Sequence, residues 1–132
     1  AQEWLDTLLD EAFAQADADG VVPEKVVWIH GEADARNQAD ALAYGGKFGA
    51  ICARIRAKWP GVGILPVRLS APMAATHPFW QDINTGVDAQ AAAHADITPV
   101  SSDGVPKQGD DLHYDPDDGY PELADRIYAA MT

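Results

Sequence analysis

The sequence predicts an α/β domain in which helices cover both faces of a parallel sheet. Two kinds of apolar segment alternate along its 132 residues. Short uninterrupted apolar runs fit strands that are buried on both faces, and longer stretches with apolar residues every three or four positions fit helices. Their order is helix, strand, helix, strand, helix, strand, helix, which is typical of a parallel sheet. A hydrophobic content of 47% provides a core, and the length suits one domain or part of one.

The charge balance excludes several classes of partner. Nine Lys and Arg residues face 21 Asp and Glu residues, and the net charge is −12. A field of this sign repels phosphate backbones and anionic membranes, so we expect neither nucleic acid nor a membrane surface as partner. No apolar run reaches the roughly 18 residues of a membrane span, and no segment typical of a secretory signal opens the sequence. The compartment stays open: secreted, periplasmic and virion-surface locations all fit.

The first half of the chain predicts two helices around one strand. The first helix covers residues 2–18 and ends near Gly20, because its apolar residues recur at helical spacing. The run Val26–Ile29 predicts a strand. The second helix covers residues 39–59 and stops at Pro60, although Gly45 and Gly46 weaken its beginning by about 1 kcal/mol each relative to Ala. The apolar stripes are Trp4, Leu5, Leu8, Leu9, Ala12, Phe13 and Ala16 in the first helix, and Tyr44, Phe48, Ile51, Cys52, Ile55 and Trp59 in the second.

The second half predicts two more strands and two more helices. Gly63–Leu69 is the second strand, although Pro66 within it cannot donate a hydrogen bond to a neighbour. A helix follows within residues 79–95, and Asp96–Ser101 is a short third strand. The closing helix begins near Pro121 and has a regular apolar stripe. Cys52, the single cysteine, lies on an apolar stripe and cannot close an internal disulfide, so we expect it to be a buried packing residue.

A first polar cluster follows the strand Val26–Ile29 directly. It contains His30, Gly31, Glu32 and Asp34. Ligands of open α/β sheets bind at the carboxyl ends of strands, and a glycine there lets the backbone approach a ligand. The alternative is structural: Gly31 forms only a turn, and Glu32 and Asp34 begin or cap a helix.

A second polar cluster precedes the closing helix, where Asp110 and His113 lie three residues apart. A carboxylate that fixes the tautomer of an imidazole, and an imidazole that takes a proton from a nucleophile, are two members of a hydrolase triad. The alternative is an acidic, solvated loop with one incidental histidine. No convincing nucleophile accompanies them, because Ser70 lacks the glycine-flanked turn that exposes such a serine. His77 fits ordinary loop chemistry, in a loop that could touch substrate.

Carboxylates near the closing helix raise the possibility of a metal. Three carboxylates close to a glycine suggest a calcium-binding loop: Asp115, Asp117, Asp118 and Gly119. The spacing of an EF-hand loop and its closing glutamate are missing, however. The sequence therefore predicts no metal and no cofactor.

Two sequence blocks resemble a known hydrolase family. The segment Val27-Trp28-Ile29-His30-Gly31-Glu32-Ala33-Asp34-Ala35 resembles the third block of the SGNH (GDSL-type) hydrolases, in the carbohydrate esterase branch that includes sialate O-acetylesterases. That branch reads Trp-x-Gln-Gly-Glu-Ser-Asp-Ala, so His30 replaces the usual glutamine. Asp110-Asp111-Leu112-His113 resembles the final block, Asp-x-x-His, and the closing helix resembles that of the branch. The resemblance covers essentially the whole chain but only the second half of the family's domain.

The resemblance implies a site and a reaction. Asp110 would orient His113, and His113 would activate a serine that attacks an ester carbonyl, commonly an O-acetyl group on a sugar. His30 and Gly31 would help to line the oxyanion site, where a good donor is worth roughly 3 kcal/mol. Glu32 and Asp34 would organise the pocket through hydrogen bonds. The expected ligand is an acetylated carbohydrate or another small ester.

The resemblance also implies a partial fold, a three-layer α/β/α sandwich of the flavodoxin-like kind. In the strand order 2-1-3-4-5, this chain would supply strands 3 to 5 as the carboxy-terminal part of one domain. The blocks that carry the nucleophile have no counterpart, so the chain alone should be inactive. We expect the amino-terminal half, on the same or a separate chain, along Val26–Ile29, because a bare apolar edge promotes aggregation. Two alternatives stay open: a non-catalytic glycan-binding module of a cell-surface or phage-type appendage, and a small flavodoxin-like domain whose blocks match by accident.

Overall fold

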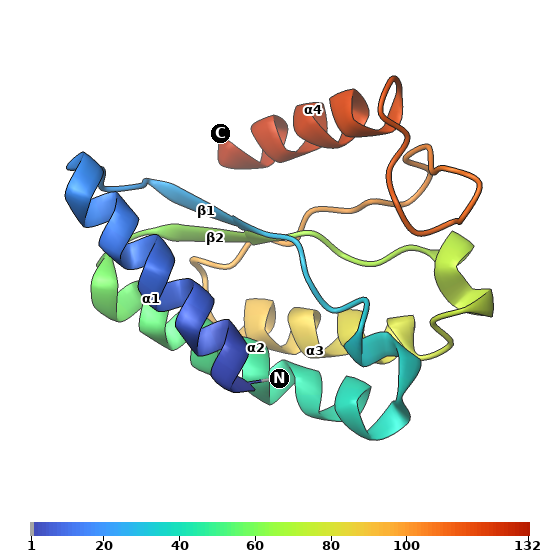
Figure 1. Ribbon diagram of the computed structural model, residues 1–132, viewed down its shortest axis with the longest axis horizontal. Helices are drawn as coiled ribbons and strands as arrows, with labels where there is room; N and C mark the ends of the chain where they lie inside the picture. The colour runs from blue at the N-terminus through green and yellow to red at the C-terminus, as the bar shows by residue number, and fades with distance from the viewer. Residues whose placement is uncertain (1) are drawn as a thin grey trace.

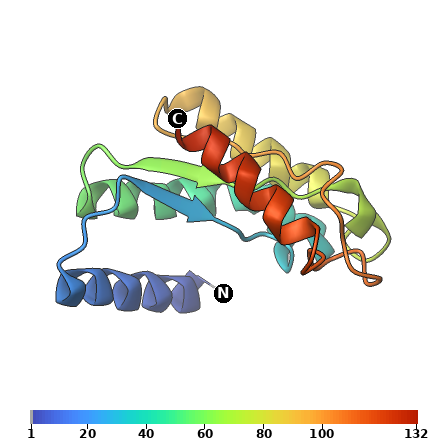
Figure 2. The ribbon, with the colours of Figure 1, turned by 90° about the horizontal axis from the view of Figure 1, so that it is seen from above.

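Three layers build the molecule, with the sheet in the middle (Figures 1 and 2). The computed structural model describes residues 2–132, and the side chains of residues 2–4, with the predicted packing of Trp4, lie outside the description. The helix labelled α4 covers one face of the sheet, and α1, α2 and α3 lie on the other side. The predicted α/β sandwich is therefore confirmed.

The elements are α1 (Gln2–Asp19), β1 (Lys25–Trp28), the 3₁₀-helix η1 (Asp34–Arg36), α2 (Gln38–Lys58), β2 (Gly63–Pro66), the 3₁₀-helix η2 (Ala71–Ala75), α3 (Trp80–Ala93) and α4 (Gly119–Met131).

The sheet consists of two parallel strands and a third segment that only touches them. β1 pairs with β2 from Lys25 opposite Gly63 to Trp28 opposite Pro66. The third segment makes isolated parallel bridges to β2, Ile64 with Ile97 and Val67 with Val100. Among the described residues, β1 has a neighbour on one side only, so it is an edge strand.

The prediction of a continuous third strand over Asp96–Ser101 is wrong, and Pro66 explains why. The N–H of Thr98 donates to the carbonyl of Ile64 at 2.9 Å, and the N–H of Val100 donates to the carbonyl of Pro66 at 2.8 Å. In a regular parallel ladder the residue at position 66 would donate in return to the carbonyl of Thr98. Proline has no N–H, so this rung is missing and the pairing divides into two separate bridges. The second strand likewise ends at Pro66 and not at the predicted Leu69.

Apolar side chains from β2 enter two cores, one on each face of the sheet. Ile64 packs with residues of α2 and α3, and its neighbour Leu65 packs toward α4 with Leu123, as the alternation of a strand requires. Cys52 is fully buried in the first core, as predicted. In the described part of the chain, no helix is both long and apolar enough to span a membrane.

Two glycines allow α2 and α3 to cross closely. A Cβ atom on Gly45 would lie 3.0 Å from the backbone of Gly86, and one on Gly86 would lie 2.8 Å from the backbone of Gly45. Gly45 therefore costs helix propensity but permits a contact that no other residue would allow. The Asn37 side chain caps α2 by accepting hydrogen bonds from the N–H groups of Ala39 and Asp40.

Candidate functional site

A pocket of about 550 Å³ opens beyond the carboxyl ends of the strands. Segments distant in sequence meet there: the loop after β1, η1, the turn after η2, and the loop before α4. Three predicted site residues, His30, Glu32 and His113, line it, and Asp110 touches it through His113. The two polar clusters thus share one pocket, at the edge of the sheet where parallel strands end and where ligands of such sheets bind. The lining residues are Ile29, His30, Glu32, Ala33, Arg36, His77, Leu112, His113, Tyr114 and Tyr120.

Asp110 and His113 form a directly bonded pair. The Nδ1 atom of His113 lies 2.5 Å from Oδ2 of Asp110. The other carboxylate oxygen, Oδ1, accepts the backbone N–H groups of Leu112 and His113, both at 3.0 Å. The hydrogen bond from His113, and then those two backbone N–H groups, lower the pKa of Asp110 to about 2. The carboxylate is therefore ionised at neutral pH, and it leaves Nε2 of the imidazole for other partners.

The loop that carries this pair lies at the surface but is well braced. The side chains of His113 and Asp110 are 62% and 47% exposed. Asp111, between them, has a φ of 58°, a left-handed conformation that aspartate tolerates better than most residues. At the loop base, the N–H of Gln108 donates to the carbonyl of His113 at 2.8 Å, and Lys107 Nζ donates to the carbonyl of Leu112 at 3.1 Å. Local hydrogen bonds therefore position the pair.

His30 is held by aromatic packing. Its ring stacks on Tyr44 with centroids 5.9 Å apart and meets Trp28 at 5.5 Å. The Tyr44 hydroxyl, whose pKa burial raises, donates to the carbonyl of His30 at 3.2 Å. The Nδ1 atom of His30 is buried and has no hydrogen-bond partner. The ring orientation is thus set by neighbours and not by a carboxylate.

Gly31 and Asp34 lie beside the pocket and do not line it. Gly31 has a φ of 120°, and a Cβ atom there would lie 2.8 Å from Cγ2 of Ile83. The Asp34 carboxylate accepts a hydrogen bond from Lys47 at 2.9 Å, which raises the pKa of that lysine and ties η1 to α2. These contacts support the structural alternative for both residues. Asp34 also begins a short helix, η1, as that alternative expected.

Two further residues line the pocket: Arg36, which sequence reasoning missed, and His77, which the sequence assigned to ordinary loop chemistry. His77 is 2% exposed, and its Nε2 atom accepts a hydrogen bond from Nε of Arg36 at 3.1 Å. Burial, and then the nearby guanidinium of Arg36, lower the pKa of His77. The two residues are 41 positions apart, so no spacing rule connects them. Arg36 follows the first polar cluster by two residues, and this was the only signal that could have pointed to it.

With this geometry established, comparison with known proteins identifies the family. Residues 2–132 match the family described as carbohydrate esterase, sialic acid-specific acetylesterase. The chain belongs to this carbohydrate esterase family. The predicted resemblance to that branch is thereby confirmed. Both sequence blocks that carried the resemblance contribute to the pocket of this esterase-family chain.

A solved structure shows the same fold in a longer protein. A protein from Arabidopsis thaliana superposes with a TM-score of 0.71 over 96% of this chain and 50% of that chain, at 16% sequence identity. The esterase-family chain therefore spans about half of the length of that structure. A search of the curated proteins found no match.

No serine lines the pocket in the part of the esterase-family chain that the structure describes. Ser70 is 1% exposed, and its hydroxyl is buried without a hydrogen-bond partner. It is not among the residues that line the pocket, so it is not placed to attack a ligand bound there.

The acidic segment before α4 has a structural explanation. Oδ1 of Asp115 accepts the N–H groups of Asp117 and Asp118, at 2.9 Å and 3.0 Å, and so forms the turn into the helix. Within residues 2–132, no three histidine, cysteine or acidic side chains converge as a metal site would require.

Proposed function

We propose that this chain carries the acid–base half of a serine esterase that removes acyl groups, commonly acetyl, from carbohydrates. The observation that carries the proposal is the ionised Asp110 bound to Nδ1 of His113 at the edge of the pocket. This arrangement leaves Nε2 to accept a hydroxyl proton. Membership of a carbohydrate esterase family supports the same reaction.

In the proposed mechanism, His113 first accepts a proton and then donates it. It takes the proton of a serine hydroxyl while the serine oxygen bonds to the ester carbonyl carbon, and Asp110 stabilises the imidazolium. His113 then gives that proton to the departing sugar oxygen as the ester bond breaks. A water molecule attacks the acyl-enzyme by the same route and releases the free acid. The transient oxyanion would lie near His30, which lines the pocket, and a good donor there contributes roughly 3 kcal/mol.

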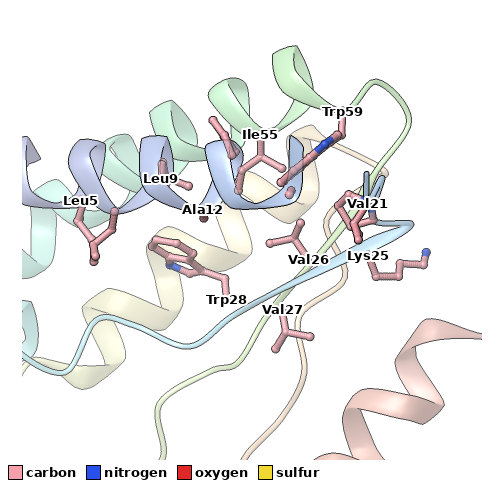
Figure 3. Close-up of a pocket in the computed structure, with 14 residues that line it drawn as sticks. Leu5, Leu9, Ala12, Val21, Lys25, Val26, Val27, Trp28, Ile55 and Trp59 are labelled. Atoms are coloured by element: carbon pink, nitrogen blue, oxygen red, sulfur yellow. The ribbon is translucent and has the colours of Figure 1, made fainter. Parts of the chain in front are cut away.

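We propose that the serine comes from an amino-terminal half, on the same or a separate chain, that adds a strand beside β1. β1 is an edge strand, and an apolar groove of about 490 Å³ lies between it and α1, with Ile55 and Trp59 also lining it (Figure 3). Leu9, Val26 and Trp28 face this groove in Figure 3. A parallel strand added here would end at the same edge of the sheet as the pocket, which suits a nucleophile placed at its carboxyl end. The twofold length of the Arabidopsis thaliana structure is consistent with such a half.

The experiment is hydrolysis of p-nitrophenyl acetate by the full-length gene product. We expect turnover by the unaltered protein, none by residues 1–132 alone, and none above background for His113→Ala. A control variant, His94→Ala at the exposed end of α3, should keep full activity. Full activity of His113→Ala would contradict the proposal, as would turnover by the isolated chain.

A second function, glycan binding without catalysis, is favoured by two specific observations. His30 replaces the glutamine that the esterase branch usually has, and no serine lines the pocket among residues 2–132. Saturable binding of an acetylated sugar by the full-length protein, without any release of acetate, would establish this function in place of the first.

A further inference from the structure

We propose that Tyr120 is the residue on which the sugar ring stacks, with the apolar face of the ring on the tyrosine and the ester directed toward His113. The inference rests on the proposed function, because it assigns a substrate contact within the same pocket. Tyr120 and His113 both line that pocket, whose volume of about 550 Å³ suits a single small ligand in contact with both.

Tyr120 offers the pocket an aromatic surface that is open to solvent. It is 51% exposed, and it lines the pocket together with Ile29, which is 50% exposed. Covering an aromatic ring contributes strongly to binding, and a tyrosine loses little side-chain freedom when a ligand settles on it. The pocket therefore has an apolar, partly aromatic side that a ligand can cover.

A chain of contacts supports the Tyr120 ring from within the protein. The ring meets that of Tyr114 in a T-shaped arrangement, with centroids 5.7 Å apart and planes at 63°. Tyr114 is buried, and the ammonium group of Lys107 lies over its ring, 3.4 Å from the centroid. Edge-to-face and cation–π contacts both hold rings in a defined orientation. Tyr120 thus rests on an immobile neighbour while it stays half open to the pocket.

The backbone beneath Tyr120 is fixed as well. The carbonyl of Asp115 accepts the N–H groups of Gly119 and Tyr120, at 3.0 Å and 2.9 Å. A Cβ atom on Gly119 would collide with the carbonyl oxygen of Pro106, so the start of α4 lies directly against that segment. The ring is therefore in place before a ligand arrives, which reduces the entropy that binding costs.

The surroundings of Tyr120 suit a sugar better than a simple alkyl ester. The C–H bonds on one face of a pyranose are slightly positive and pack on the electron-rich face of an aromatic ring. The hydroxyl groups at the edge of the sugar need hydrogen-bond partners. Glu32 and Arg36 line the same pocket, where a carboxylate accepts such bonds and a guanidinium donates them. An aromatic surface next to charged groups matches both parts of a sugar ring.

The test compares two esters on the full-length protein: an O-acetylated methyl pyranoside, and ethyl acetate, which has no ring to stack. For Tyr120→Ala we expect KM for acetate release from the sugar ester to rise about tenfold, with kcat and the hydrolysis of ethyl acetate nearly unchanged. Tyr120→Phe keeps the ring and should stay within about twofold of the unaltered protein. The control Tyr128→Ala removes a 71% exposed tyrosine of the same helix that does not line the pocket, and it should affect neither ester.

The outcomes separate this inference from the proposed function. If both esters are hydrolysed and Tyr120→Ala leaves KM for the sugar ester unchanged, the esterase function stands and the stacking contact is wrong. If Tyr120→Ala lowers kcat for the sugar ester, or slows both esters equally, Tyr120 supports the His113 loop through Tyr114 and the inference is likewise overturned. Hydrolysis of ethyl acetate alone would also contradict it.

If the unaltered protein hydrolyses neither ester, the esterase function fails, and the stacking contact is then judged by binding. Isothermal titration calorimetry with the same sugar ester should show an affinity about tenfold weaker for Tyr120→Ala than for Tyr128→Ala. Equal affinities of these two variants, or no binding by the unaltered protein, would overturn the inference.

Discussion

The two loops that meet at the pocket are held by different forces. Residues 29–36, after β1, are fixed by packing: His30 lies against Tyr44 and Trp28, and Gly31 approaches Ile83 so closely that a side chain has no room. In residues 107–115, before α4, Leu112 and Tyr114 pack against the cores, but Asp110 and His113 lie at the surface and are fixed by hydrogen bonds, three of which Asp110 accepts. The packed loop determines the shape of the pocket, and the hydrogen-bonded loop brings the group that can move a proton.

This contrast has a consequence for mutations. Changes at the exposed Asp110 and His113 should affect chemistry and leave folding nearly untouched, because exposed side chains contribute little to stability. Changes in the packed loop should affect folding first. The following predictions test that division, from the largest expected effect to the smallest.

The sharpest test is Asp110→Asn in the full-length protein. The amide keeps the shape of the carboxylate but cannot stabilise an imidazolium, so we expect kcat for acetate release to fall by about 10³- to 10⁴-fold. The melting temperature should move by only a few degrees. The matched control is Asp117→Asn, in the neighbouring turn. A loss of folding in Asp110→Asn, measured by circular dichroism, would remove the distinction between the two loops.

In the packed loop, Gly31→Ala should destabilise the fold by about 2–4 kcal/mol. The new Cβ atom would meet Ile83 at 2.8 Å, and the φ of 120° is unfavourable for alanine. Gly46→Ala in α2 is the control, because nothing lies within 4 Å of its added Cβ and alanine is the better helix former. Urea unfolding should show opposite signs for the two variants, and equal effects would contradict the packing argument.

A smaller effect should follow from Tyr44→Phe, which tests the aromatic support of His30. The substitution keeps the stacked ring and removes the hydroxyl that bonds Trp28 and the carbonyl of His30, at a cost of about 1–2 kcal/mol. Thermal unfolding measures the loss, and Tyr128→Phe on the exposed face of α4 is the control. An unchanged stability would mean that the ring alone holds His30.

The smallest effect is the pH dependence of the hydrogen-bonded loop. The pKa of Asp110 in the folded protein, about 2, lies below its ordinary value of 3.8. The pairing therefore stabilises the folded loop above pH of about 4, and this contribution is lost as the pH falls through about 2. Carboxyl-carbon NMR titration should give a midpoint near 2 for Asp110, whereas a midpoint near 3.8 would show that the pair is not formed in solution.

The sequence alone predicted the features that depend on neighbouring residues. The alternation of helices and strands, the burial of Cys52 and the parallel sheet follow from local periodicity, and α2 and α3 lie close to their predicted bounds. Asp110 and His113 were predicted as a pair because residues three apart in a turn meet through local hydrogen bonds. The resemblance to the carbohydrate esterase family rested on short sequence blocks, and the family match over residues 2–132 confirms it.

The tertiary structure decided the features that depend on residues far apart in the chain. Pro66 lies beside Thr98 of another segment and has no N–H to donate to its carbonyl, so the predicted third strand is divided. Arg36 and His77 meet only because η1 and η2 end at the same side of the pocket. The burial of Ser70 excludes it as the nucleophile. Local periodicity specifies which face of an element is apolar, but the partner that covers each face is chosen only when the whole chain packs.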